Sequence, residues 1–178
     1  MRVIAGTRGG RKLVAPDTAS TRPVADRVKE SLFSSIAAEI PDAIVADLFA
    51  GAGSFGIEAL SRGAVRAVFV ENGRKALAAL RANLASLDLD GGEVHALDVA
   101  KWDPDRDFDI VFCDPPWPMG QAELEETLQR IAPAVVEDGL VVVTRRSSDP
   151  VPAPGAYRID DERTIGDTRI IRYRKETQ

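Results

Sequence analysis

The sequence has few of the residues that build disulfide frameworks or zinc sites. Its 178 residues include one cysteine, Cys113, and one histidine, His95. A single cysteine excludes an intramolecular disulfide, and one cysteine with one histidine cannot complete a zinc site of the Cys/His type. We therefore expect no disulfide and no metal.

Long apolar runs are also missing. No stretch reaches the ~18 consecutive apolar residues of a membrane-spanning helix, and the first residues lack the apolar segment of about 7–15 residues that marks a signal peptide. With 44% hydrophobic and 29% charged residues, the chain has the composition of one globular domain. We expect a cytoplasmic, monomeric protein with no membrane contact.

Charge is distributed unevenly along the chain. The net charge is −5, but residues 1–30 carry seven basic and three acidic side chains, whereas residues 31–144 carry eight basic and nineteen acidic ones. A basic leading segment on an acidic body is typical of a protein that binds a polyanion, although a basic arm can also serve solubility alone. We predict a basic N-terminal extension over residues 1–40 and a catalytic domain over residues 41–178.

The hydrophobic pattern predicts an α/β fold. In the N-terminal extension, two short strands flank a glycine-rich turn within residues 2–14, and the spacing of Val28, Leu32, Phe33 and Ile36 predicts an amphipathic helix. Beyond it, apolar strands alternate with helices, which is typical of a parallel sheet covered on both faces. The expected strands cover residues 44–49, 67–71, 93–97, 108–113 and 140–144. Three helices are expected between them: one that follows the glycine-rich turn and ends near residue 62, and two that cover residues 74–87 and 121–131.

The end of the chain breaks this alternation. Residues 156–161 and 168–173 flank Gly166 and Asp167 with no helix between them, so we predict an antiparallel hairpin. The complete prediction is a doubly wound, mostly parallel seven-stranded sheet of the Rossmann-like type, with a C-terminal antiparallel hairpin and an N-terminal extension of a hairpin and a helix. The basic residues from Arg169 to Lys175 are interpreted as the solvent face of the last strand.

A glycine-rich turn follows the first long strand. Residues 51–56 (GAGSFG) open a helix, and Glu71 ends the next strand, 20 residues after Gly51. In this context the glycines let a cofactor approach the backbone and the acidic residue binds a ribose diol, although a ligand-free tight turn can have the same sequence. The pattern alone fits both a nicotinamide dinucleotide and S-adenosylmethionine.

Two further carboxylates favour S-adenosylmethionine. Asp47, four residues before Gly51, would repel a pyrophosphate but suits the ammonium group of a methionine moiety. Asp98, at the end of the third strand, is placed to accept a hydrogen bond from an adenine amino group. We therefore predict S-adenosylmethionine as the cofactor. The candidate cofactor-binding residues are Asp47, Phe49, Gly51, Gly53, Phe55, Glu71 and Asp98.

The candidate catalytic residues are Asp114, Pro115, Pro116 and Trp117, directly after the fourth strand. This position is the carboxyl edge, where α/β sheets bind their ligands, and the two prolines make the segment a rigid loop. The Asp114 carboxylate and the Pro115 carbonyl can accept both hydrogens of an exocyclic amino group, while Trp117 offers a face for a planar base. Taken without their context, the same residues can also be interpreted as an ordinary turn followed by a surface aromatic residue with no catalytic role.

These residues resemble those of a known enzyme family, the bacterial 16S rRNA (guanine-N2)-methyltransferases of the class I S-adenosylmethionine-dependent fold. The similar blocks cover residues 2–13 (RVIAGTRGGRKL), 22–33 (RPVADRVKESLF), 47–64 (DLFAGAGSFGIEALSRGA) and 114–117 (DPPW). The last block is shared with DNA adenine-N6 methyltransferases, so the two N-terminal blocks are the specific part. The family usually has two threonines at Val24 and Ala25 and tends to be acidic at Thr144-Arg145-Arg146.

The resemblance implies methylation of the N2 amino group of a guanine in small-subunit ribosomal RNA. It also implies that basic residues of the first 30 contact RNA phosphates, which gives affinity and register and not base identity. The candidates are Arg8, Arg11, Lys12, Arg22 and Arg27.

Two other classes of function stay open. One is an N6-adenine methyltransferase of DNA or RNA, although 178 residues leave no room for the target-recognition domain that DNA enzymes usually carry. The other is a non-catalytic RNA-binding factor in ribosome assembly, against which the complete Asp114-Pro115-Pro116 sequence argues. His95 and Cys113 are interpreted as structural residues, the cysteine as a buried thiol at the end of an apolar strand.

Overall fold

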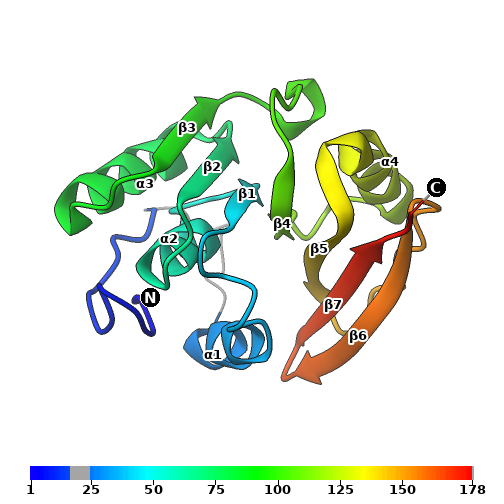
Figure 1. The fold of residues 1–178 in the computed structure, drawn as a ribbon, viewed down its shortest axis with the longest axis horizontal. Coiled ribbons are helices and arrows are strands. Elements are labelled where there is room, and N and C mark those ends of the chain that lie inside the picture. The colour runs from blue at the N-terminus through cyan, green and yellow to red at the C-terminus, as the bar shows by residue number, and fades with distance from the viewer. Residues whose placement is uncertain (17–24, 178) are drawn as a thin grey trace.

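A seven-stranded sheet forms the centre of residues 1–16 and 25–177, the part of the chain that the computed structural model describes (Figure 1). The strands are β1 (Ile44–Leu48), β2 (Arg66–Glu71), β3 (Gly92–Ala96), β4 (Phe108–Cys113), β5 (Val135–Arg146), β6 (Tyr157–Ile165) and β7 (Thr168–Lys175). The helices are α1 (Asp26–Ser35), α2 (Ser54–Ser61), α3 (Arg74–Leu87) and α4 (Gln121–Ile131), with 3₁₀ turns η1 (Val99–Lys101) and η2 (Ala132–Ala134).

The strand order is β3-β2-β1-β4-β5-β7-β6. Strands β1 to β5 are parallel, whereas β7 pairs antiparallel with both β5 and β6. The predicted doubly wound sheet with a C-terminal hairpin is therefore confirmed. The order reverses between β1 and β4, and in such sheets ligands bind at the carboxyl ends of the strands beside this reversal. We call this side of the sheet the carboxyl edge and the opposite side the amino edge.

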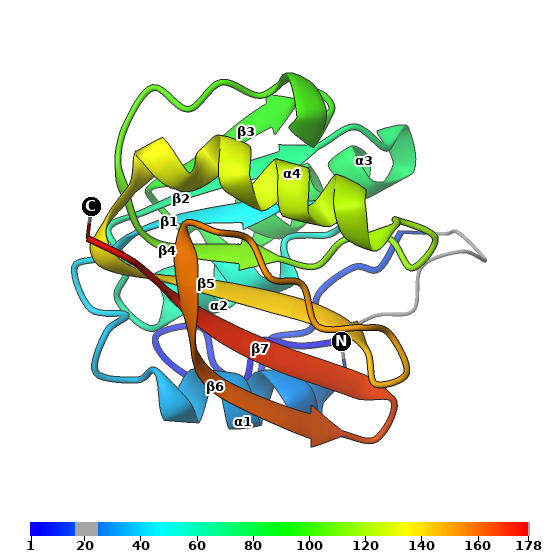
Figure 2. The ribbon, with the colours of Figure 1, turned by 90° about the vertical axis from the view of Figure 1, so that its right-hand side faces the viewer.

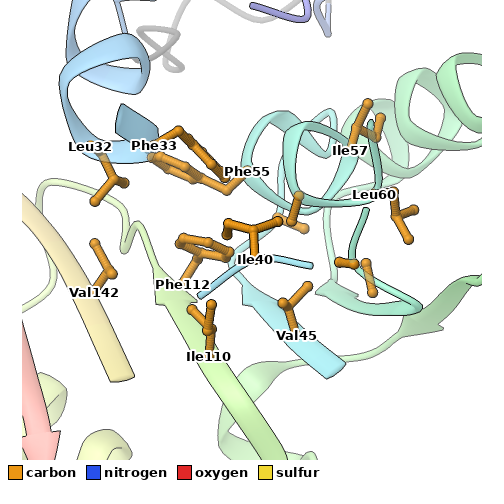
Figure 3. Close-up of a cluster of buried hydrophobic side chains, with 14 of the residues drawn as sticks. Leu32, Phe33, Ile40, Val45, Phe55, Ile57, Leu60, Ile110, Phe112 and Val142 are labelled. Carbon is orange, nitrogen blue, oxygen red and sulfur yellow. The ribbon is translucent and has the colours of Figure 1, made fainter. Parts of the chain in front are cut away.

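Helices cover both faces of the sheet, as Figure 2 shows from the side. Alternate strand residues point to opposite faces, so Val45 packs with α1, α2 and α3, whereas its neighbour Ala46 packs with α4. Phe33, Phe55 and Phe112 fill the centre of the first layer, with ring centroids 5.4–6.3 Å apart (Figure 3). None of the helices in residues 1–16 and 25–177 is long and apolar enough to cross a membrane.

The N-terminal residues form a short hairpin that packs into the first layer. The pairing is limited to one bridge, between Arg2 and Lys12, and a hydrogen bond of 2.9 Å from the Val3 amide to the Arg11 carbonyl oxygen. Val3 and Leu13 are 0% and 7% exposed and belong to the same hydrophobic cluster as α1 and α2. The expected N-terminal extension therefore shares its core with the rest of the chain.

A buried carboxylate on α2 fixes this hairpin. Glu58 accepts hydrogen bonds from the amides of Ile4 and Ala5, at 2.7 and 3.0 Å. It also pairs with Arg62 at 2.7 Å and with Lys29 of α1 at 3.5 Å, and the side chains of Glu58 and Lys29 are fully buried. Burial lowers the pKa of Lys29, while the Glu58 carboxylate opposes that shift. One carboxylate thus joins the N-terminal segment, α1 and α2.

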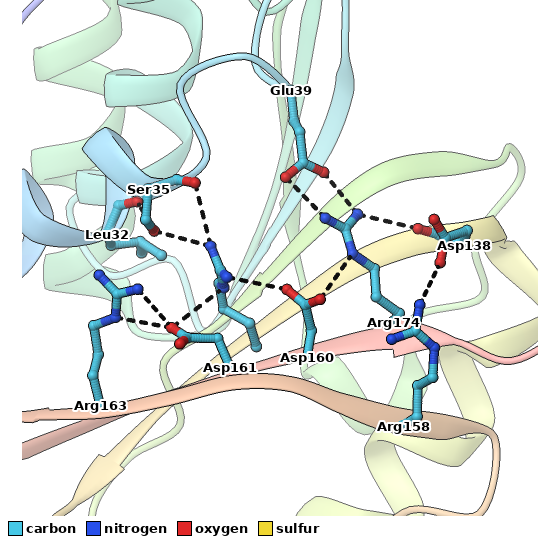
Figure 4. Close-up of polar contacts among 10 residues, drawn as sticks. Leu32, Ser35, Glu39, Asp138, Arg158, Asp160, Asp161, Arg163 and Arg174 are labelled. Atoms are coloured by element: carbon cyan, nitrogen blue, oxygen red, sulfur yellow. Dashed lines mark hydrogen bonds and ion pairs between the residues drawn. The ribbon is translucent and has the colours of Figure 1, made fainter.

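The arginines of β7 have a different role from the one expected. Arg172 donates to the Ser35 carbonyl oxygen and hydroxyl at the end of α1, and Arg174 forms a two-bonded ion pair with Glu39 (Figure 4). Their side chains are only 14% and 17% exposed. The interpretation of Arg169 to Lys175 as a solvent face is therefore wrong for these two residues, because α1 and the segment after it lie over this side of β7.

Strand β5 begins five residues earlier than the sequence pattern predicts. Asp138 has a positive φ of 54°, and the pairing with β4 shifts register between Phe108 and Ile110. This irregularity interrupts the apolar pattern before Leu140, so the first part of the strand was not recognisable from the sequence.

Candidate functional site

The glycine-rich turn lies at the carboxyl edge, between the end of β1 and the start of α2. Phe49, Gly51 and Gly53 have positive φ angles of 58°, 57° and 84°, a conformation that favours glycine. A Cβ added to Gly53 would lie 2.5 Å from a methyl carbon of Leu80, whereas one added to Gly51 would meet no atom within 4 Å. Gly53 is therefore required for packing, and the backbone at Gly51 faces open space that a ligand can enter.

Glu71 ends β2 and is held against this turn. Its Oε2 accepts a hydrogen bond of 2.8 Å from the Gly51 amide, and its Oε1 accepts one of 2.6 Å from the Gly73 amide. The residue is half-buried, and each carboxylate oxygen can accept a further hydrogen bond. This is the geometry that a carboxylate needs to bind a ribose diol without moving.

Asp47 lies beneath the turn and is buried. Its Oδ2 accepts a hydrogen bond of 2.8 Å from the Gly56 amide in the first turn of α2. Burial raises the pKa of Asp47 to about 8, and the nearby carboxylates of Asp114 and Glu71 act in the same direction. A cationic group that reached Asp47 would stabilise its ionised form.

Asp98 follows β3 and forms the N-cap of η1. Its Oδ1 accepts from the Ala100 amide at 2.9 Å, and its Oδ2 accepts from the Asn72 side chain at 3.2 Å. Beside it, a pocket of about 150 Å³ is lined by Phe49, Asp98, Ala100, Met119, Glu123, Glu126, Thr127 and Arg130. The pocket places an aromatic ring and a carboxylate within reach of one planar heterocycle.

The side chain of Phe55, a predicted cofactor-binding residue, lies in the core. Its ring is 3% exposed and lies 6.3 Å from Phe33 and 5.5 Å from Phe112, measured between ring centroids (Figure 3). Phe55 therefore fills the core, and only its backbone amide reaches the site, where it lowers the pKa of Asp47.

Asp114 lies at the end of β4, next to the end of β1. It is half-buried, and its Oδ1 accepts a hydrogen bond from the hydroxyl of Thr144, a buried residue of β5. Burial raises the pKa of Asp114 to about 6, and the Thr144 hydroxyl opposes this shift because it stabilises the ionised form. Thr144 was not among the predicted site residues; a hydroxyl at the end of an apolar strand was its only sequence signal.

The residues after Asp114 form the expected loop. Pro115 is buried, the Pro116 carbonyl oxygen accepts a hydrogen bond of 2.9 Å from the Met119 amide, and α4 begins two residues later. Trp117 is 41% exposed, so part of its ring is accessible to a base. Within residues 1–16 and 25–177, no group of side chains could hold a metal ion. Burial raises the pKa of the Cys113 thiol, which is inert at neutral pH.

Asn83 connects the N-terminal segment to the glycine-rich turn. It is fully buried in α3, its Oδ1 accepts from the Val14 amide at 2.7 Å, and its Nδ2 donates to the carbonyl oxygens of Val14 and Ala52, both at 3.0 Å. Asn83 was not predicted as a site residue. Its sequence signal was a polar side chain three residues after Leu80, on the apolar face of α3.

Two of the predicted RNA-binding residues lie at the amino edge, away from Asp114. Arg8 donates to the carbonyl oxygens of Leu87 and Asp88, and Arg11 donates to that of Ser86. These carbonyls end α3, just before β3 begins. The guanidinium of Arg8 therefore holds the N-terminal hairpin on α3.

Two others lie elsewhere. Arg27, in the first turn of α1, is exposed and lies at the β6–β7 turn, where a Cβ added to Gly166 would come within 2.3 Å of its Nη2. This turn adjoins the end of β5, so Arg27 is at the carboxyl edge. Lys12 is exposed and forms the bridge with Arg2 in the N-terminal hairpin, and Arg22 lies outside the described residues.

Known proteins match this chain over its whole length. Residues 1–174 match the family described as "Conserved hypothetical protein 95". "Ribosomal RNA small subunit methyltransferase D" of Escherichia coli strain K12 is 34% identical over 183 residues, which cover 100% of this chain and 91% of that protein. The protein of the same name from Haemophilus influenzae is 33% identical and covers 98% of this chain and 92% of its own length.

Solved structures agree with these sequence matches. The Escherichia coli protein yhhF superimposes with a TM-score of 0.87 at 33% identity and covers 100% of this chain and 99% of its own. An RNA methyltransferase of Salinibacter ruber in complex with S-adenosyl-L-homocysteine has a TM-score of 0.69 at 17% identity, over 88% of this chain and 95% of its own, and shows a common fold alone. This chain therefore belongs to the family described as Conserved hypothetical protein 95.

Proposed function

We propose that this chain transfers a methyl group from S-adenosylmethionine to the N2 amino group of a guanine in small-subunit (16S) ribosomal RNA. The observation that carries the proposal is the position of Asp114, at the end of β4, beside the glycine-rich turn at the end of β1. A carboxylate that can hold an amino group thus adjoins a turn that suits a cofactor. The names of relatives that match almost the full chain support the same substrate class.

The residues at the carboxyl edge fit the proposed cofactor. Glu71 would hold the ribose hydroxyls, Asp98 and Phe49 the adenine, and Asp47 the ammonium group, while Gly51 leaves room for the backbone approach. When bound, S-adenosylmethionine supplies an electrophilic methyl group on a positively charged sulfur.

The chain's own residues orient the nucleophile. The Asp114 carboxylate accepts one hydrogen of the guanine amino group, the Pro115 carbonyl accepts the other, and the exposed part of Trp117 stacks on the base. Holding both hydrogens directs the nitrogen lone pair, and such orientation supplies much of the rate. Asp114 also stabilises the positive charge that develops on the nitrogen. No strong base is needed, because the nitrogen becomes acidic only as the N–C bond forms and the bond from the methyl group to sulfur breaks, and its proton is then lost to water.

Labelled methyl transfer tests the function. The protein is incubated with radiolabelled S-adenosylmethionine and with naked 16S rRNA, assembling small subunits or double-stranded DNA. We expect label in one or both RNA substrates and none in DNA. Label in DNA would favour the N6-adenine alternative, and no transfer to any substrate would favour a non-catalytic assembly factor.

Glu71→Ala is expected to weaken cofactor binding by one to two orders of magnitude, since a charge-assisted hydrogen bond contributes ~1.5–3 kcal/mol. The substitution also frees the Gly51 amide that orders the turn. Titration calorimetry with S-adenosylhomocysteine measures the effect, and Glu137→Ala, at an exposed position near the start of β5 and away from the pocket, is the control. Unchanged affinity in a folded Glu71→Ala variant would remove this residue from the site.

The RNA-binding residues are best tested by substitution, because deleting the N-terminal segment would remove Val3 and Leu13 from the core. Replacing Lys12 and Arg27 by glutamine is expected to make the dependence of log K on log salt shallower, by ~0.7–0.9 for each phosphate that the protein no longer neutralises. Arg158→Gln, an exposed arginine paired with Asp138, is the control. A parental slope in the double variant would mean that neither residue binds phosphate.

A further inference from the structure

The last residues of β5 contact the loop that carries Asp114 at three points. Thr144 binds the first residue of the loop. Arg145 is buried, and its Nη1 donates to the Met119 carbonyl oxygen at 3.0 Å. The Cζ atom of Arg146 lies 4.1 Å from the centroid of the Trp117 ring. The loop is thus supported along its length by one neighbouring strand.

The two arginines differ in what neutralises them. Arg145 pairs with Asp149 at 3.1 Å. Arg146 is exposed, and its guanidinium meets neither a carboxylate nor another hydrogen-bond acceptor anywhere in residues 1–16 and 25–177. The neighbouring hairpin is different, since its arginines pair with carboxylates. Figure 4 shows this for Arg158, Arg163 and Arg174. Arg169 and Arg172 pair with Glu162 and Asp160. Among the residues that the structure describes, nothing neutralises the charge of Arg146 at the carboxyl edge.

The position of Arg146 also limits how Trp117 can be used. A guanidinium over an indole ring is attracted by the ring quadrupole and covers one face. A base can then stack only on the other face. The N–H donors of a guanidinium lie in its plane, and none of those of Arg146 has a partner in residues 1–16 and 25–177, so they are available to a ligand.

We propose that Arg146 binds an RNA phosphate beside the target nucleotide and, from the same position, restricts base stacking to the free face of Trp117. The inference rests on the proposed function and adds to it the residue that anchors the RNA next to the catalytic loop. A guanidinium is well suited to phosphate oxygens, which accept paired charge-assisted hydrogen bonds.

The test compares Arg146→Met, which removes the charge but keeps an extended side chain, with Arg146→Lys, which keeps the charge. For Arg146→Met we expect the KM for RNA to rise ~10-fold, as for the removal of one charge-assisted hydrogen bond, with kcat close to the parental value. The salt slope of log K should fall by ~0.7–0.9. Arg146→Lys should recover most of the KM and the slope, and Arg158→Met, which removes a paired exposed arginine, should change neither.

Tryptophan fluorescence provides a second readout. The chain has two tryptophans, and the other, Trp102, is 3% exposed, so quenching by acrylamide reports on Trp117. Arg146→Ala, which removes the side chain beyond Cβ, should increase quenching because it uncovers one ring face.

A parental KM and salt slope in Arg146→Met would overturn the inference. A fall in kcat with an unchanged KM would overturn it as well, because Arg146 would then only support the loop. Both of these results bear on Arg146 only when the unmodified protein methylates RNA in the same assay. A protein that transfers no methyl group to RNA would instead contradict the proposed function.

Discussion

Replacing Asp114 by alanine is expected to lower the rate of methyl transfer ~10²–10³-fold, the scale for one preorganised electrostatic interaction with a developing charge. The substitution keeps the Pro115-Pro116 loop and the Trp117 ring but removes the acceptor of one amino hydrogen. Because this interaction strengthens as the nitrogen becomes cationic, turnover should fall more than RNA affinity. Asp114→Asn should retain part of the activity, since its amide oxygen accepts a hydrogen bond without the charge. Single-turnover kinetics at saturating RNA and cofactor measure both variants.

The pH dependence gives a second check on Asp114. Its pKa is raised to about 6, and only the ionised carboxylate has the proposed charge, so the rate should rise as pH increases through about 6 and then level off. Thr144→Val removes the hydrogen bond that lowers this pKa, so the midpoint should move to higher pH. A parental rate in Asp114→Ala would mean that residues 114–117 form only a turn.

Glu58→Ala is expected to cause the largest loss of stability, ~3–5 kcal/mol, which is typical of breaking a buried ion pair by removing one partner. The substitution leaves Lys29 buried without its carboxylate and frees the amides of Ile4 and Ala5. The N-terminal hairpin should then detach from α2. Urea unfolding followed by circular dichroism measures the change.

Glu93→Ala is the matched control for this effect. Like Glu58, Glu93 pairs with two basic side chains, here Arg66 and Arg106, but the Glu93 side chain is 31% exposed. Surface ion pairs of this kind contribute about 0–1 kcal/mol. A loss of stability for Glu58→Ala no larger than that for Glu93→Ala would show that the buried network is not what holds the hairpin.

The fold could be predicted where local pattern alone determines the structure. The bounds of β4, α3 and α4 agree with the expected ones because each element is a continuous apolar or amphipathic run. The turn at Gly166 and Asp167 separates β6 from β7 as expected. By contrast, β5 is longer than predicted, because the positive φ of Asp138 interrupts the apolar pattern. The burial of Arg172 and Arg174 depends on Ser35 at the end of α1 and on Glu39 after it, which lie 137 and 135 residues away in sequence.

In the candidate site, too, features set by local sequence were predictable and features set by distant contacts were not. Asp114, Glu71 and the glycine-rich turn were recognisable because strand ends and their motifs are local in sequence. Thr144 and Asn83 were not, since their partners are 30 to 69 residues away. The burial of the Phe55 side chain was not recognisable either, since its ring packs against Phe33 and Phe112, which are distant in sequence. The position of Arg8 and Arg11 at the amino edge likewise depends on where α3 ends.

The most direct test of the proposed function is mass spectrometry of the nucleosides of 16S rRNA from a strain that lacks this gene. The strain is complemented with the unmodified gene or with the Asp114→Ala variant. We expect the amount of N2-methylguanosine to fall by one residue per 16S rRNA in the deletion strain, to be restored by the unmodified gene, and not to be restored by the variant. Unchanged N2-methylguanosine in the deletion strain, or loss of a methylated adenine in its place, would contradict the proposed function.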